Sequence, residues 1–139
     1  MKVIFDTSVY VDYLRSGKLA HIVEGRAGQA VVHLSAVVAQ ELLVGAPDRK
    51  AVRFLEGLVN RFNAMGRLVV PEIQDWMRAG SAIRQVAQRH GFEQVRRARL
   101  TNDALILASG LRLGATILTR NADDFALLRG HLPAAVVGL

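Results

Sequence analysis

The apolar positions of this chain alternate between short unbroken runs and longer segments with helical spacing. A short apolar run bounded by polar or turn residues is typical of a strand that is buried on both faces. Such runs predict strands at 2–5, 30–34, 67–71, 115–119 and 134–138. The first run ends abruptly at Asp6, and a charge in that position is costly to bury unless it is paired, hydrated or bound to a metal.

Apolar residues spaced at i, i+3 and i+4 predict helices between these strands. The predicted helices run from Asp6 to Gly17, over 19–27, 36–44, 48–63, 72–89 and 103–113, and over a short stretch after the strand at 115–119. The helix at 72–89 has an apolar stripe that we expect to be buried, beginning with Ile73, Trp76 and Met77. The segment 90–103 has no clean periodicity and is expected to be mostly loop.

Strands that alternate with helices predict a parallel sheet covered on both faces. The fold class expected is therefore three-layer α/β/α, with a central four- to five-stranded, mainly parallel sheet. The length of 139 residues fits one domain spanning 1–139.

Composition narrows the chemistry. The absence of cysteine excludes disulfides, thiolate metal sites and cysteine nucleophiles. The glycines form neither a P-loop nor a G-x-G-x-x-G motif, and no serine lies in a G-x-S-x-G context. The apolar run after Lys2 is too short for a signal peptide, and no segment is long enough to span a bilayer, so a cytoplasmic location is expected.

The net charge of +6 comes mostly from arginine. A small, basic, arginine-rich protein favours a polyanionic partner, nucleic acid first. The alternative, that the charge reflects only solubility or a G+C-rich genome, stays open at this point.

Five of the 12 acidic residues lie just past a predicted strand or in an early turn of a predicted helix: Asp6, Glu41, Asp103, Asp123 and Asp124. Ligands of open parallel sheets bind outside the carboxyl ends of the strands. Carboxylates that converge there repel one another unless a cation compensates, and a hard divalent ion with oxygen ligands does so. An acidic, metal-binding pocket in a basic protein suits phosphodiester hydrolysis.

Structural alternatives exist for most of these acids. Asp6 is also a good helix N-cap, Asp103 also suits the positive end of a helix dipole, and Asp123-Asp124 also suits a turn. Glu41 is harder to explain in this way, because its helix is apolar nearly all round, so a partner for the carboxylate is expected.

Three segments of the chain carry a family resemblance. The segments "VIFDTS", "SAVVAQELLVGA" and "LTNDALILASGLRLGATILTRNADDF" resemble PIN-domain ribonucleases of the VapC type, which are toxins of type II toxin–antitoxin pairs. The resemblance spans nearly the whole chain. It implies four catalytic acids around Mg²⁺ or Mn²⁺, here Asp6, Glu41, Asp103 and Asp124, with Asp123 as the competing candidate for the fourth position.

The resemblance also implies the surroundings of the site and the partners. Ser8, Thr119 and Asn121 match positions that border the site. A cognate VapB-type antitoxin and a homodimer are implied by the family alone. Arginines near the site are expected to contact the RNA backbone, namely Arg96, Arg97, Arg99 and Arg120, although a solvated face is an equal reading of the first three.

The hypothesis is endonucleolytic cleavage of RNA, with Asp6 and Asp103 holding the metal and Glu41 and Asp124 completing its shell. Two rivals remain. One is an aspartyl phosphotransferase that uses Asp6 as nucleophile, although position 8, where a second acid is usual, is serine. The other is a catalytically weak PIN-fold module that binds RNA.

Overall fold

The computed structural model describes residues 1–17, 26–98 and 100–139, and its sheet is built around the first strand. Strand β1 (Lys2–Phe5) lies between β3 (Ala30–Ser35) and β5 (Thr116–Thr119) and is parallel to both. Two more strands, β4 (Leu68–Val69) and β6 (Val136–Gly138), extend the sheet in parallel beyond β3 and β5. The predicted mainly parallel sheet is confirmed.

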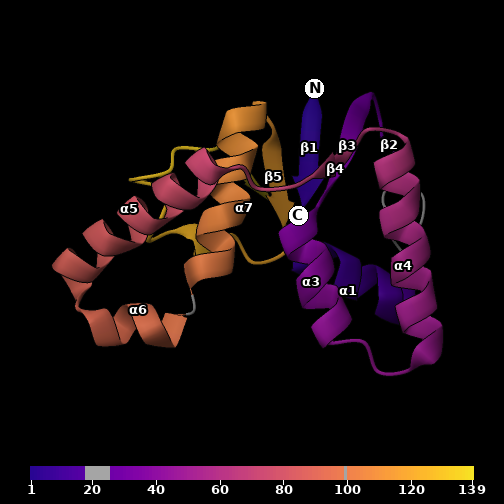
Figure 1. Cartoon of the computed structure of the whole chain (residues 1–139), viewed down its shortest axis with the longest axis horizontal. Helices are drawn as coiled ribbons and strands as arrows, with labels where there is room; N and C mark the ends of the chain where they lie inside the picture. The colour runs from indigo at the N-terminus through magenta and orange to yellow at the C-terminus, as the bar shows by residue number, and fades with distance from the viewer. Residues whose placement is uncertain (18–25, 99) are drawn as a thin grey trace.

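Helices lie on both sides of this sheet. Figure 1 shows α1 and α4 on one side and α5, α6 and α7 on the other, with α3 packed against α1, α4 and α7 near the carboxyl ends of the strands. The bounds are α1 Thr7–Ser16, α3 Ala36–Val44, α4 Arg49–Ala64, α5 Ile73–His90, α6 Phe92–Ala98, α7 Leu100–Leu113 and the 3₁₀ helix η1 Ala122–Phe125. The predicted three-layer α/β/α class is confirmed.

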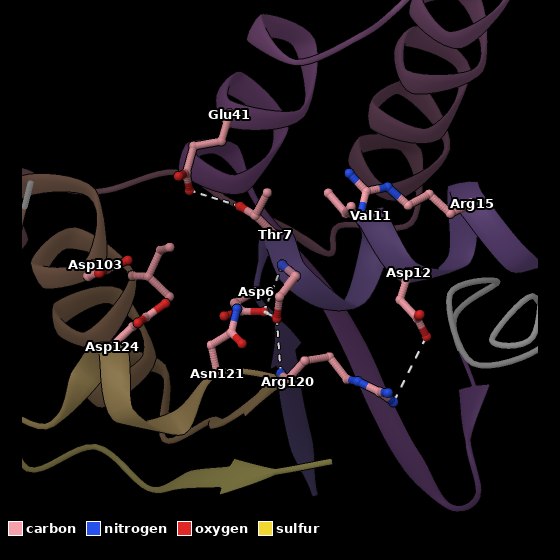
Figure 2. A pocket seen from close by; sticks show the side chains of 12 residues that line it. Asp6, Thr7, Val11, Asp12, Arg15, Glu41, Asp103, Arg120, Asn121 and Asp124 are labelled. Atoms are coloured by element: carbon pink, nitrogen blue, oxygen red, sulfur yellow. Dashed lines mark hydrogen bonds and ion pairs between the residues drawn. The ribbon is translucent and has the colours of Figure 1, made fainter.

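Local signals in the sequence explain where the first elements begin and end. Val3, Ile4 and Phe5 are fully buried, as expected of a central parallel strand. Asp6 caps α1 directly after them (Figure 2), and Gly17 ends that helix with a φ of 67°. The side chain of Ser35 caps α3 in the same way, accepting hydrogen bonds from the next turn. Both helices therefore start at the carboxyl edge of the sheet.

The prediction of a helix over 19–27 is wrong for positions 26 and 27, which the structure describes. Positions 18–25 lie outside the described residues, but Arg26–Ala27 form a short strand, β2, antiparallel to the start of β3. Gly28 has a φ of 62°, a conformation that suits glycine and allows the chain to reverse before β3. Hairpin formation therefore replaces helix at the end of this segment.

The prediction that 90–103 is mostly loop is also wrong. Helix α6 occupies Phe92–Ala98, and α7 begins at Leu100, three residues earlier than expected. Leu100 is buried and Val95 packs against the core, while α6 lies against α5. Tertiary packing thus makes a short, arginine-rich segment helical although its own periodicity is weak.

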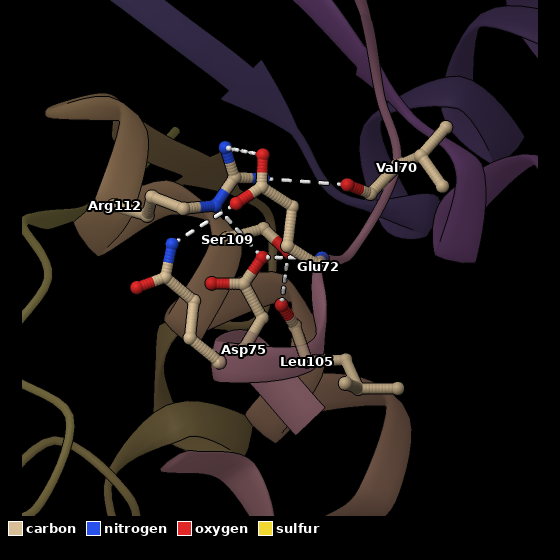
Figure 3. A network of polar contacts seen from close by, with 7 residues as sticks. Val70, Glu72, Asp75, Leu105, Ser109 and Arg112 are labelled. Atoms are coloured by element: carbon tan, nitrogen blue, oxygen red, sulfur yellow. Dashed lines mark hydrogen bonds and ion pairs between the residues drawn. The ribbon is translucent and has the colours of Figure 1, made fainter. Parts of the chain in front are cut away.

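The predicted apolar stripe of α5 fails in its first turns. Ile73, Trp76 and Met77 are exposed, at 76%, 52% and 68%, whereas Asp75 is fully buried. The Asp75 carboxylate accepts hydrogen bonds over 2.9 Å from the Glu72 backbone N–H and from Arg112 Nε of α7 (Figure 3). In the first turns of α5 this polar network takes the place of apolar side chains, whereas further along the helix Ala79, Val86 and Ala87 are buried as predicted.

No helix in the described ranges combines the length and the apolar character that a membrane crossing requires.

Candidate active site

The carboxyl ends of β1 and β5 meet at one point of the sheet edge, and Asp6 lies there. The Asp6 backbone N–H donates to the Leu118 carbonyl oxygen over 3.0 Å, which continues the pairing of the two strands by one residue. The side chain of Asp6 is buried, with 7% of the residue exposed. A buried carboxylate needs compensation, and the neighbouring residues provide part of it.

Hydroxyl groups hold both oxygens of the Asp6 carboxylate. Oδ1 accepts from the Ser8 backbone N–H over 3.0 Å and also from Ser8 Oγ. Oδ2 accepts from Oγ1 of the fully buried Thr119 over 2.5 Å. Asp6 is thus both the N-cap of α1 and a fixed member of the site, so the capping interpretation and the functional one are compatible.

Glu41 reaches the same place from α3. Its Oε1 accepts a hydrogen bond from Thr7 Oγ1 over 2.9 Å, and Glu41 itself is half-buried. Thr7 is the first residue of α1 and Glu41 lies in the second turn of α3, so this bond joins the start of one helix to the middle of another that packs against it. The partner expected for a carboxylate on an apolar helix is therefore a threonine hydroxyl.

Asp103 contributes the third carboxylate from the first turn of α7. Burial raises the pKa of its carboxyl group to about 7, and the negative charge of Glu41 is the next largest cause. The charges of Asp124 and Asp6 raise this pKa further. Like charges that raise a pKa in this way mark a place where a cation would be stabilised.

The fourth acid comes from η1, after β5. Asp124 lines the pocket, whereas its neighbour Asp123 is not among the lining residues. The Asp124 backbone N–H donates to the carbonyl oxygen of Asn121, whose own N–H donates to Thr119 Oγ1 over 2.9 Å. The turn that presents Asp124 is therefore tied to the threonine that holds Asp6.

These side chains surround one cavity of about 460 Å³ (Figure 2). Its lining comprises Asp6, Thr7, Ser8, Val11, Asp12, Arg15, Glu41, Asp103, Ile106, Arg120, Asn121 and Asp124. All four acids predicted from the sequence are present, as are Ser8 and Asn121, while Thr119 lies buried behind Asp6.

Sequence reasoning missed several lining residues, including Thr7, Asp12 and Arg15. Helical spacing was the available signal, because Thr7 and Arg15 are eight residues apart on a helix that begins beside Asp6.

The four arginines that we expected to contact the RNA backbone differ in their position relative to the pocket. Arg120 lines the pocket. Arg96 is exposed on α6 and is not among the lining residues. The side chain of Arg97 and the whole of Arg99 lie outside the described residues.

The donor set of the pocket fits a hard divalent cation. Its possible ligands are carboxylate oxygens, the type that magnesium and manganese prefer. Among the described residues, no three acidic or histidine side chains converge closely enough to form a ready cage for one ion. The pocket therefore fits an ion bound through one or two carboxylates and water, which is the usual habit of magnesium.

Comparisons with known proteins agree with this geometry. The family model of the PIN domain matches residues 3–130. A VapC ribonuclease of Mycobacterium bovis and the ribonuclease VapC11 of Mycobacterium tuberculosis are each 35% identical to the chain over 131 residues, which are 91% of this chain and 92% of each relative.

Solved structures share the fold. VapBC-1 from nontypeable Haemophilus influenzae matches with a TM-score of 0.69 at 19% identity, covering 99% of this chain and 98% of that one. FitAcB from Neisseria gonorrhoeae matches with a TM-score of 0.67 at 22% identity, covering 98% and 96%. The chain belongs to the PIN-domain family and, within it, to the VapC ribonucleases.

Proposed function

We propose that this protein is a divalent-metal-dependent endoribonuclease and the toxin of a type II toxin–antitoxin pair. One observation carries the proposal: carboxylates from four separate segments line one pocket of a protein whose net charge is +6. Acids gathered in this way do not attract RNA, so they need a cation between them and the phosphate. The names of the curated relatives, which are VapC ribonucleases, support RNA as the substrate. A cytoplasmic location is part of the same proposal.

Asp6 and Asp103 are the proposed direct ligands of Mg²⁺ or Mn²⁺. Asp6 is buried and oriented by Ser8 and Thr119, so its carboxylate is fixed before any ion arrives. Burial, and after it the charges of the neighbouring acids, raise the pKa of Asp103, so a cation beside this carboxylate would favour its charged form. Glu41 and Asp124 complete the shell through water.

The metal would supply Lewis-acid polarisation of a phosphoryl oxygen and a lowered pKa for a nearby water. The carboxylates of this chain would orient that water and accept its proton. The oxygen of the water then bonds to phosphorus while the opposite P–O bond breaks, and the departing oxygen takes up a proton. Glu41, held at Oε1 by Thr7, and the exposed Asp124 leave carboxylate oxygens available for that proton transfer.

A cognate VapB-type antitoxin and a homodimer are part of the same proposal. The fold neighbours are described as VapBC from Haemophilus influenzae and, bound to DNA, VapBC from Salmonella typhimurium. These likenesses support a partner of the VapB type for this chain, which would suppress cleavage until it is removed.

The aspartyl phosphotransferase alternative receives no support from the site. This chemistry usually needs a second acid two residues after the nucleophile, and here that position is Ser8, whose N–H and hydroxyl both donate to Asp6.

Incubation of the purified protein with total RNA tests the proposed function. We expect discrete cleavage products in Mg²⁺ or Mn²⁺, none in chelator, and full recovery when the metal is added back in excess. Cleavage that continues unchanged in chelator would refute the metal dependence, and intact RNA under all conditions would refute the nuclease.

A further inference from the structure

The pocket has two chemically different ends. Figure 2 shows Glu41, Asp103 and Asp124 toward one end, and Arg15 and the side chain of Arg120 toward the other. Asp6 lies between the two ends, where the backbone of Arg120 also approaches. The acidic end accounts for the chemistry proposed above. The basic end has no part in that chemistry, so its two arginines require a separate explanation.

Arg15 belongs to the face of α1 that leads away from Glu41. Thr7, Val11 and Arg15 follow one another at four-residue spacing, so they lie on one face of this helix, and all three line the pocket. Thr7 bonds to Glu41 at the start of this row, and Arg15 stands at its other end. Arg15 is exposed, and no carboxylate of the described residues forms an ion pair with it. Within the described part of the chain, its guanidinium is therefore open to an anion in the pocket.

Arg120 is anchored at its backbone and loosely held at its side chain. Its backbone N–H donates to Ser8 Oγ over 2.9 Å, and Ser8 Oγ in turn donates to Asp6. The guanidinium lies 3.9 Å from Asp12 Oδ2, with the Arg120 side chain 46% and the Asp12 side chain 32% exposed. An ion pair that long and that exposed contributes little. A phosphate, which accepts charge-assisted hydrogen bonds from arginine, can replace Asp12 as the partner of Arg120.

An RNA strand that enters this pocket brings more than one phosphate. The phosphate to be cleaved lies at the acids, where the metal compensates its charge. The next phosphate along the backbone is repelled by the same acids and gains nothing from a metal beyond its reach, so it needs a fixed cation of its own. Arg15 and Arg120 are the arginines in the pocket lining, and they stand on the side of Asp6 away from Asp103 and Asp124.

We propose that Arg15 and Arg120 form a second phosphate subsite, which binds the backbone phosphate next to the cleaved one, and that Asp12 holds Arg120 while no RNA is bound. This inference rests on the proposed ribonuclease function. It states that the substrate strand runs from the metal site toward the end of the pocket that holds Arg15 and Arg120. Both arginines position the strand and take no part in the proton transfer.

Steady-state kinetics on a short RNA oligonucleotide, made around a cleavage site mapped in total RNA, test the subsite. Arg15→Gln and Arg120→Gln are each expected to raise KM by about tenfold with kcat nearly unchanged, because they remove binding that is common to substrate and transition state. Arg15→Lys keeps the charge and should recover most of the loss. The matched control is Arg53→Gln, which removes an exposed arginine of α4 outside the pocket lining.

A second substrate locates the contact. The same oligonucleotide is made with one uncharged methylphosphonate linkage beside the cleaved bond. If the subsite exists, the neutral linkage raises KM for the wild type but adds little to the defect of Arg15→Gln or Arg120→Gln, because variant and linkage remove the same interaction. Asp12→Asn, which frees Arg120, should lower KM for the charged substrate by about twofold.

The outcomes separate this inference from the proposed function. If the wild type cleaves RNA and both Gln variants behave as Arg53→Gln does, the second subsite is refuted and the nuclease stands. Defects of the Gln variants that simply add to the effect of the neutral linkage would also refute it. If the wild type cleaves no RNA, the proposed function fails and this inference fails with it.

Discussion

Thr119 Oγ1 donates a hydrogen bond to Asp6 Oδ2 over 2.5 Å and thereby joins the carboxyl ends of two neighbouring strands at the acidic pocket. Thr119 is fully buried, and its hydroxyl also accepts from the Asn121 backbone N–H over 2.9 Å. One hydroxyl thus fixes both the first acid and the turn that presents Asp124. The bond makes the orientation of Asp6 a property of the fold rather than of the bound metal.

Thr119→Val removes this hydroxyl with little change of shape. We expect a loss of cleavage rate of about 10- to 100-fold, the usual effect of removing a group that orients a metal ligand. Circular dichroism should show an unchanged fold. Thr116→Val, on the same strand, is the matched control and should retain activity. Equal activities of the two variants would contradict the role of Thr119.

The raised pKa of Asp103 predicts a pH-dependent stability in the absence of divalent metal. Because the folded-state pKa of about 7 lies above the ordinary value of 3.8, Asp103 favours folding most below pH 3.8, and this contribution is lost as the pH rises through 7. The melting temperature in chelator should therefore fall more steeply between pH 4 and pH 8 in the wild type than in Asp103→Asn. Parallel curves for the two proteins would contradict the shift.

Magnesium should reverse this destabilisation. An ion that binds only the folded protein stabilises it by about 2.7 kcal/mol at a hundred times its Kd. Thermal unfolding at pH 7.5 should shift upward with Mg²⁺ in the wild type but not in Asp6→Asn/Asp103→Asn. Manganese should act likewise. An equal rise in the wild type and the double variant would place the ion elsewhere on the protein.

Arg112 forms an ion pair with the buried Asp75 outside the pocket, and we expect that breaking this pair destabilises the fold. Asp75 is fully buried, and its Oδ1 has no hydrogen-bond partner among the described residues, so Arg112 is its compensating cation. Arg112→Met should lower the free energy of unfolding by about 3 kcal/mol, because it leaves the buried Asp75 carboxylate without a compensating cation. Urea denaturation measures the loss, and Asp75→Asn in the same background should restore part of it. A loss no larger than that of the exposed Arg53→Met would contradict the pairing.

Much of the fold was predictable because local and tertiary signals agree. The apolar run before Asp6, the capping residue Ser35 and the amphipathic spacing in 48–63 each specify one element, and each element forms. The placement of the four acids followed from a general rule, that parallel strands present their carboxyl ends at one edge. The catalytic roles assigned to these acids stay predictions.

The failures share a different cause. Helix α6 and the early start of α7 depend on contacts with α5 and the core, which no local period encodes. In the first turns of α5 the buried residue is Asp75, which bonds to Arg112, 37 positions away, while Trp76 is exposed against the apolar pattern of the helix. Hydrogen bonds such as the one from the Thr7 hydroxyl to Glu41 likewise join segments that are distant in the sequence, so no residue spacing predicts them.

Cleavage of RNA by four single variants tests the central claim most directly. Asp6→Asn, Asp103→Asn and Asp124→Asn are compared with Asp123→Asn, an adjacent carboxylate of η1 outside the pocket lining. With Mg²⁺ present and folding verified for each protein, the account predicts no detectable cleavage for Asp6→Asn and Asp103→Asn, a severe loss for Asp124→Asn, and near wild-type cleavage for Asp123→Asn. Full activity in Asp6→Asn or Asp103→Asn would contradict it.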